Sequence, residues 1–311
     1  MSFLINLLPW ILSLVFVSIL GLCLGSFVGA FVTRYVRSEK VTKGRSHCDF
    51  CNHLLSWREN IPLISWLVQK GKCRHCGHSL SAFYPGVELA TALTFGSLYF
   101  YFFKTALPIF IAPVDFIRFV SFILALLISL TLIAIFFADL RDGIIPDVSL
   151  IWGVALTVIY KIWDAASGYW LLRSNLLDPA NKLGKYLIQT GFLDFHLKNY
   201  YLIPLAWDLG GAILAVAFFL LLVLVTRGRG MGLGDVKFAF LMGLLCGWPK
   251  IAVAIMIAFV TGALVSLVLM LFKKKGLKST IHFGPFLVLA IPIALLWSDF
   301  LLQLYFKIRP S

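Results

Sequence analysis

Charged residues are scarce in this chain, and negative charge is the scarcest kind. Asp, Glu, Lys and Arg make up 13% of the 311 residues, whereas soluble globular proteins contain roughly 25%. With only 14 acidic residues against 27 basic ones, the net charge is +13. This leaves too little polar surface to cover a soluble core of such a size.

Cysteine and proline are also few, and glycine is present only at about its average share. The 6 cysteines exclude a disulfide scaffold, and the 12 prolines and 24 glycines exclude collagen-like and low-complexity chains. Hydrophobic residues, by contrast, reach 60% and the mean hydropathy is +0.94. The composition predicts a polytopic, all-α membrane helix bundle. In such a protein a basic excess indicates cytoplasmic loops facing anionic lipid, so we expect contact with membrane lipid and no nucleic-acid partner.

Eight apolar segments are candidate membrane-spanning helices, given that about 20 residues cross the hydrocarbon layer, although 148–163 and 237–248 are short. The N-terminus has neither a basic start nor a small-residue cleavage site, so we expect its apolar segment to be a retained helix. No strand-like alternation or internal repeat stands out. The eight segments are 7–31, 84–103, 116–138, 148–163, 209–226, 237–248, 251–272 and 284–306.

Basic residues predict the orientation of these helices. Three connections rich in Lys and Arg fall on one side in an eight-helix count, which makes that side cytoplasmic and both termini external. The long segment 164–203 would then lie outside the cytoplasm. The basic residues are Arg34, Arg37, Lys40, Lys43, Arg45, Arg58, Lys70, Lys72 and Arg74 in the first connection, Arg227 and Arg229 in the second, and Lys273, Lys274, Lys275 and Lys278 in the third.

Four cysteines form two C-x-x-C pairs, Cys48 with Cys51 and Cys73 with Cys76. Two such turns can close a tetrahedral thiolate cage, and a reducing cytoplasmic loop keeps the thiols available. We therefore predict a structural Zn²⁺ site, with a redox-active or incidental pair of turns as the alternative. Neighbouring histidines are possible substitute ligands: His47, His53, His75 and His78.

Two aspartates stand at predicted helix ends, Asp139 after the third segment and Asp235 before the sixth. Two helices separate them, so both carboxylates reach the same face. Paired carboxylates that are partly desolvated do not both ionise easily, so one stays protonated while the other activates water, as in an aspartic protease. A helix cap is the alternative for each aspartate alone.

Gly232 and Gly234 permit close approach of a substrate backbone. A phosphate-binding loop is a weaker explanation, because no strand precedes these glycines.

A different class of protein, a transporter or channel, would use the same two aspartates as ion or proton ligands. Transporters usually place such groups near the bilayer midplane, at interrupted helices. Here both aspartates lie at helix ends beside connections, which favours the peptidase over the transporter.

Together these residues resemble the bacterial prepilin peptidase (type IV leader peptidase) family. Motifs that match in family order cover nearly the whole chain. A presenilin-like intramembrane protease, which shares the Gly-x-Gly-Asp element, is a third possibility, but Ala138-Asp139, Ile145-Pro146-Asp147 and the Cys pairs favour the prepilin group. The matching motifs are Leu24-Gly25-Ser26-Phe27 with Arg34, the two Cys pairs, Trp57-Arg58-Glu59-Asn60-Ile61-Pro62, Tyr84-Pro85 with Glu88, Asp139 with Ile145-Pro146-Asp147, and Gly232-Leu233-Gly234-Asp235 with Lys237.

The resemblance implies an aspartic endopeptidase of the bacterial inner membrane that removes basic leaders from type IV prepilins or type II secretion pseudopilins. It assigns catalysis to Asp139 and Asp235, the substrate loop to Gly232, Gly234 and Lys237, and zinc to the four cysteines. For many bacterial members it also implies N-methylation of the product with S-adenosylmethionine. The expected domains are a first helix (1–37), a cytoplasmic zinc domain (38–83) and a peptidase domain (84–311) with an external insertion at about 164–203.

Overall fold

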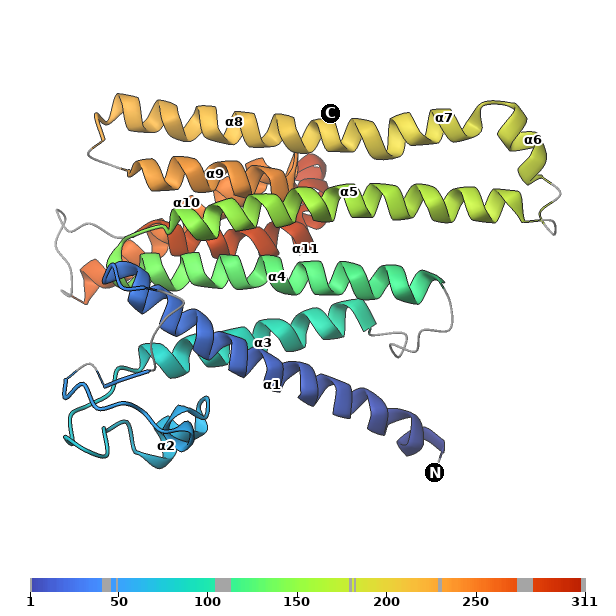
Figure 1. Cartoon of the computed structure of the whole chain (residues 1–311). Helices are drawn as coiled ribbons and strands as arrows, with labels where there is room; N and C mark the ends of the chain where they lie inside the picture. Colours follow the sequence, from blue (N-terminus) through green and yellow to red (C-terminus); the bar gives the residue numbers. More distant parts are fainter. Residues whose placement is uncertain are drawn as a thin grey trace. The chain divides into compact units, whose positions relative to one another are not determined.

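The computed structural model describes residues 2–40, 46–48, 50–103, 113–178, 181, 183–228, 231–272 and 282–308. Within these residues the chain is helical almost throughout, and strand-like pairing is limited to two isolated bridges, His47–Leu54 and Lys72–Ser79. The chain divides into two compact units, Met1–Asp142 and Gly143–Ser311. Figure 1 labels the helices of both units.

The first unit contains three long helices, α1 (Ser2–Val36), α3 (Phe83–Phe103) and α4 (Pro113–Asp142). Small residues let α1 lie directly on α3: a Cβ atom at Gly25 would stand 2.7 Å from the Cα atom of Glu88. This is the close helix contact that small residues permit in membranes. Between α1 and α3 the chain forms a small irregular domain with the 3₁₀ turn η1 (Trp57–Asn60) and the short helix α2 (Ile64–Val68).

Two buried clusters hold this three-helix unit together. Towards one end aromatic rings pack edge to face, with Phe122 beside Tyr99, Phe102 and Phe103. Towards the other end aliphatic side chains join all three helices: Val28, Val32, Val87, Ile133, Ala134 and Ala138. The second cluster lies at the end of the unit where α4 carries Asp139.

The second unit is arranged around α9 (Leu233–Cys246), which packs against α5 (Asp147–Leu177), α8 (Ile203–Val225), α10 (Lys250–Leu271) and α11 (Gly284–Ile308). Because most of α9 is buried, its side chains must pack against neighbouring helices on every face. Gly243 meets the backbone of Ala212 on α8, where any side chain would collide.

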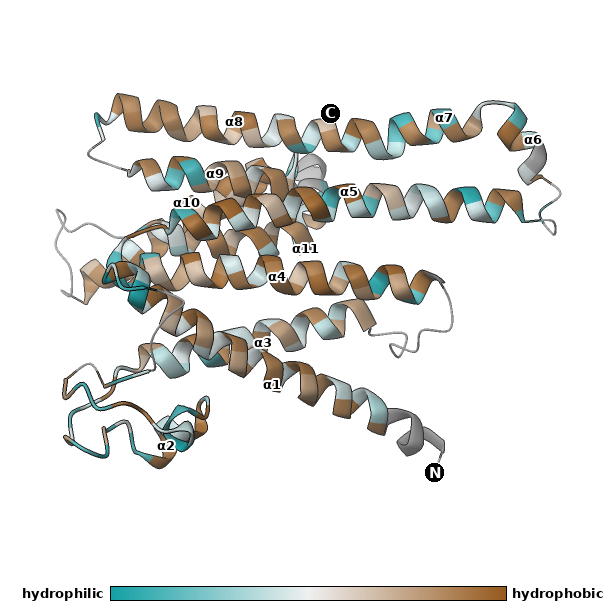
Figure 2. Ribbon diagram, viewed as in Figure 1, coloured by the Kyte–Doolittle hydropathy of each residue, from teal (hydrophilic) through white to brown (hydrophobic). Residues whose placement is uncertain are grey.

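Apolar residues predominate along the long helices, as the brown stretches of α1, α4 and α8 show in Figure 2, and many of their side chains are exposed, among them Phe16, Ile151 and Leu224. Five of the described helical stretches are long and apolar enough to cross a membrane: 8–36, 114–142, 147–177, 192–225 and 250–271. A sixth, Gly284–Ser298, is apolar but shorter. The predicted all-α membrane fold is confirmed, and each of the eight predicted segments coincides with a helix.

Helix boundaries differ from the prediction most in the segment 164–203. Here α5 continues fourteen residues beyond its predicted end at 163, to Leu177. By comparison, α9 begins only four residues before its predicted start at 237, at Leu233. From Leu177 the chain returns through α6 (Gly184–Gln189), α7 (Phe192–His196) and the π-helical turn η2 (Leu197–Leu202) directly into α8. Charged residues such as Asp164 and Arg173 break the apolar run without breaking the helix, so hydropathy alone ended α5 too soon.

Candidate active site and metal centre

The two C-x-x-C pairs form matching turns. In the first, the Cys48 amide donates to the His53 carbonyl at 3.0 Å and the Asn52 amide donates to the Cys48 carbonyl at 3.0 Å. In the second, the Cys73 amide donates to the His78 carbonyl and the Gly77 amide to the Cys73 carbonyl, both at 2.9 Å. Each turn passes through the left-handed region, at Asn52 (φ 54°) and Gly77 (φ 70°), which Asn and Gly adopt most readily.

These turns bring the four cysteine sulfurs together. All four Sγ atoms lie within 4.8 Å of one another, and Cys48 Sγ is 3.9 Å from Cys76 Sγ. Thiolates at about 2.3 Å from a tetrahedral zinc ion are about 3.8 Å apart, so the spacing fits such an ion. Backbone N–H groups of Cys76 and His75 point to the Cys73 sulfur and lower the pKa of this thiol to about 7. The four cysteines can therefore hold a metal ion.

The two turns belong to a short internal repeat, so the expectation that the chain has no repeat is wrong at this scale. Residues 48–56 and 73–81 share the pattern C-x-x-C-x-H-x-L-S. The two isolated bridges, His47–Leu54 and Lys72–Ser79, occupy equivalent positions in the two copies. The repeat is only nine residues long and is separated by unrelated sequence, which is why composition and hydropathy do not reveal it. We call residues 46–82 the knuckle domain.

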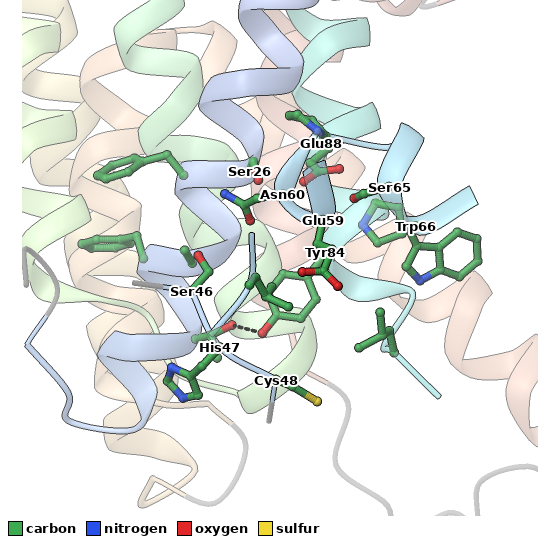
Figure 3. A pocket seen from close by; sticks show the side chains of 18 of the residues that line it. Ser26, Ser46, His47, Cys48, Glu59, Asn60, Ser65, Trp66, Tyr84 and Glu88 are labelled. Carbon is green, nitrogen blue, oxygen red and sulfur yellow. Dashed lines mark hydrogen bonds between the residues drawn. The ribbon is translucent and has the colours of Figure 1, made fainter. Parts of the chain in front are cut away.

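A cavity of about 520 Å³ lies between the knuckle domain, the end of α1 and the start of α3 (Figure 3). Glu88, which is 6% exposed, forms part of its wall and accepts a hydrogen bond of 2.7 Å from the Leu63 amide and another from Ser26. Its burial and its hydrogen bond to Leu63, 25 positions earlier in the sequence, fix the carboxyl group between α3 and the loop that leads into α2.

Glu59 forms another part of the cavity wall, and its carboxylate is fixed by Ser56, the residue just before η1. Its Oε2 atom accepts hydrogen bonds from the Ser56 amide at 2.9 Å and the Ser56 hydroxyl at 2.7 Å. These bonds lower the pKa of Glu59, because they stabilise its charged form. The carboxylate is therefore ionised at neutral pH.

Asp139 lies near the end of α4 and is only 5% exposed. The α4 end is attached to the other two helices of the unit by Arg141, whose Nη1 donates to Thr33 Oγ1 on α1 at 3.1 Å. The Arg141 guanidinium also lies 4.7 Å from the centre of the Phe83 ring at the start of α3. Arg141 and Thr33 were not among the predicted site residues. The one signal in the sequence was that Arg141 lies two positions after Asp139.

Asp235 lies in the first turn of α9 and is half-buried. Its Oδ2 accepts a hydrogen bond of 3.3 Å from the Gly232 amide, which closes the helix start. Gly234 faces Ile145, and a Cβ atom there would already be 3.4 Å from Ile145 Cδ1. The start of α9 therefore packs against the segment that leads into α5.

The third predicted substrate-loop residue, Lys237, makes an intramolecular contact. Its ammonium lies 2.7 Å from Asp147 Oδ1, and both side chains are 57% exposed. This ion pair joins the first turns of α9 and α5 at the end of the unit that carries Asp235. The structure thus brings the four cysteines together and places each predicted aspartate at a helix end within its own unit. Gly230, Arg229 and the lysines 273–275 and 278 lie outside the described residues.

These features define a multi-pass membrane protein with a cluster of four cysteines that can hold a metal ion, and with an aspartate at a helix end in each of two helical units. The chain belongs to the type IV leader peptidase family. The profile of that family matches residues 126–267, and the profile of the Bacterial Peptidase A24 N-terminal domain matches residues 19–102. The predicted resemblance and the peptidase class are thereby confirmed.

Curated relatives cover most of the chain. A prepilin leader peptidase/N-methyltransferase of Aeromonas hydrophila is 32% identical over 266 residues, which are 84% of this chain and 74% of the relative. A protein with the same name from Bacillus subtilis (strain 168) is 27% identical over 291 residues, 93% of this chain and 96% of the relative. A third, from Myxococcus xanthus (strain DK1622), is 28% identical over 261 residues, 83% and 63% of the two chains. No solved structure matches the chain.

Proposed function

We propose that this protein cleaves the basic leader from type IV prepilins or type II secretion pseudopilins, with Asp139 and Asp235 as the catalytic pair. The observation that carries the proposal is that the family profile spans both aspartates and that each stands at a helix end within its own unit. Asp139 lies three residues before the end of α4. Asp235 lies in the turn where Gly234 faces Ile145 and Lys237 binds Asp147.

The chemistry follows from two carboxyl groups that share one proton. The ionised carboxylate takes a proton from a water molecule as the water oxygen attacks the scissile carbonyl, and the protonated carboxyl donates to the carbonyl oxygen. Collapse of the tetrahedral intermediate breaks the C–N bond, and the amine leaves with a proton from the pair. Gly232 and Gly234, without side chains, leave room for the substrate backbone beside Asp235.

The leader sequence and the charge of the knuckle domain suggest the side of the membrane on which cleavage occurs. Arg34, Arg37, Arg58 and Arg74 belong to the end of α1 or to the knuckle domain. The positive-inside rule places such residues on the cytoplasmic side of the bacterial inner membrane. The same rule keeps a basic leader in the cytoplasm while the apolar helix of the prepilin enters the bilayer. The scissile bond then reaches the catalytic pair without opening a spanning helix, which would be costly in lipid.

Zinc is the ion that we assign to the four cysteines. Four thiolates make a closed tetrahedral set with no open position, which is typical of a structural Zn²⁺ site. Such an ion would hold the two turns of the knuckle domain together. Its ligands come from one loop of the first unit and none is an aspartate, so zinc has no part in cleavage in this scheme.

N-methylation of the new N-terminus is a second candidate function, and the cavity beside Glu88 favours it. The cavity volume lies within the usual range for cofactor sites of roughly 300–1,000 Å³. Its lining combines the acids Glu59 and Glu88 with the rings of Phe27, Trp66 and Tyr84. This set fits S-adenosylmethionine: carboxylates accept from ribose hydroxyls or an amino group, and aromatic faces attract a cationic sulfonium. When bound, S-adenosylmethionine supplies a methyl group to the free amine.

Mass spectrometry of a prepilin incubated with the purified protein tests both activities. We expect loss of the leader, and on addition of S-adenosylmethionine an increase of about 14 Da, one CH₂, on the mature chain. An intact prepilin, or a cut elsewhere than the leader boundary, would contradict the assignment.

The side of cleavage needs a separate experiment in sealed vesicles. A prepilin whose leader charge is inverted, so that the leader is translocated, should stay uncut although the normal prepilin is processed. Efficient cleavage of the inverted substrate would show that the aspartates do not face the cytoplasm.

A further inference from the structure

The knuckle domain contains a second group of metal-ligand side chains besides the four cysteines. The ligand atoms of His53, His75 and Glu59 all lie within 4.8 Å of one another. We propose that these three residues form a second, exchangeable transition-metal site, which takes a divalent ion such as Zn²⁺, Co²⁺ or Ni²⁺. The inference does not depend on the proposed peptidase activity, and of its three residues Glu59 also lines the cavity proposed for S-adenosylmethionine.

The fold brings the three side chains together from three turns. His53 follows the first C-x-x-C pair by two residues, and His75 lies within the second pair. Their rings stack with centroids 3.4 Å apart and planes inclined by 32°. Glu59 comes from η1, which follows the first turn directly. The ligands therefore join both halves of the repeat to the 3₁₀ turn.

The internal repeat supplies a comparison for the two stacked histidines. In the repeat, Phe50 is equivalent to His75 and His78 is equivalent to His53, and this second pair stacks in the same way, at 3.4 Å and 34°. A phenyl ring, that of Phe50, can therefore stack at this position, so stacking alone does not require a histidine at position 75. Of the two pairs, the one formed by His53 and His75 has two imidazoles, and it is also the one that Glu59 approaches.

Glu59 is oriented as a ligand would have to be. The two hydrogen bonds from Ser56 hold its carboxylate through Oε2, at 2.9 and 2.7 Å. A carboxylate has about four lone-pair sites, so two hydrogen bonds leave acceptor capacity for a cation. Fixing a ligating carboxylate by outer hydrogen bonds is typical of metal sites.

The donor set determines which ions the site takes and how tightly. Imidazole nitrogens suit Zn²⁺, Ni²⁺ and Cu²⁺, and one carboxylate adds an oxygen ligand. Three protein ligands leave at least one position for water, unlike the closed set of four thiolates. Both histidines are exposed, and Arg74 is the chain neighbour of His75, so the ion exchanges with solvent more readily than the thiolate-bound one.

Metal content of the full-length protein in detergent tests the proposal, with Zn²⁺ as the probe. We expect two zinc ions per chain at saturating Zn²⁺ and one after a weak chelator. His53→Ala and Glu59→Gln should each hold one ion at saturation. The matched control, His78→Ala, removes the equivalent histidine of the repeat and should still hold two.

Cobalt spectra of the unaltered protein assign the ions without any variant. The first Co²⁺ should show intense thiolate charge-transfer bands, and the second should add only weak ligand-field bands. One ion per chain at saturation in the unaltered protein would overturn the proposal. Two ions in His53→Ala, or a second Co²⁺ with thiolate bands, would overturn it equally.

Discussion

The two helical units carry their aspartates in different surroundings. In the first unit Asp139 is 5% exposed, and Arg141 ties the end of its helix to α1 and α3. In the second unit Asp235 is half-buried in the first turn of α9, beside an exposed ion pair between Lys237 and Asp147. One carboxyl group is therefore buried by packing, and the other lies at a partly exposed helix start beside Gly232.

The units also differ in the structures that accompany their aspartates. The first unit has the knuckle domain and the cavity beside Glu88, both built from residues of that unit alone. The comparison suggests that metal binding and methylation belong to the first unit, and that cleavage needs an aspartate from each. Changes confined to the first unit should separate these activities.

The largest expected effect is the loss of bound zinc when two of the four cysteines of the first unit are changed. Changing Cys48 and Cys51 together to Ser removes two of four zinc ligands, so the tightly held ion should be lost completely. Elemental analysis of the purified variant measures this. Cleavage should persist, because neither aspartate belongs to the knuckle domain. Full zinc retention in the double variant would contradict the site.

Glu88→Gln should separate methylation from cleavage. A hydrogen bond to a charged group contributes about 1.5–3 kcal/mol, so its loss should lower methylation by roughly 10- to 100-fold. The measured quantity is the methylated fraction of mature pilin over time, and leader removal in the same samples is the internal control. An equal decrease in both rates would show that Glu88 supports the fold rather than the cofactor.

Gly25→Ala should destabilise the first unit by crowding α1 against α3. The added Cβ atom would stand 2.7 Å from the backbone of Glu88, which costs about 1–3 kcal/mol if the helices must shift. Gly29→Ala is the matched control on the same helix, since a Cβ there lies 3.5 Å from the nearest atom, on the Tyr84 ring. Thermal unfolding in detergent should show a lower Tm for the first variant only. Equal Tm values would mean that the close contact is not required.

The smallest effect is expected for the ion pair of the second unit. Lys237→Ala removes a pair whose side chains are both 57% exposed, and such pairs contribute about 1 kcal/mol or less. Tm should therefore change little. A large loss of cleavage at unchanged Tm would instead support the role in substrate binding that the sequence assigned to Lys237.

Hydropathy and motif spacing predicted all eight long helices, the four cysteines and the peptidase family. They could not show that α5 continues to Leu177, because helix propagation through Asp164 and Arg173 depends on packing rather than on apolar content. The partnership of Arg141 with Thr33 joins residues 108 positions apart, and single-sequence patterns carry no such information. The stacking of His53 on His75 also arises only once the two turns are folded together.

The most direct test of the central claim compares cleavage rates of Asp139→Asn, Asp235→Asn and the double variant, with Asp142→Asn as the neighbouring control. An amide can neither act as base nor share the proton, so each single change should lower the rate by about 10²–10⁴-fold or more. Because the two carboxyl groups act as one unit, the double variant should be no slower than the worse single variant. The control should keep substantial activity. Near-normal cleavage by either single variant, or losses that multiply in the double variant, would contradict a catalytic pair formed by one aspartate from each unit.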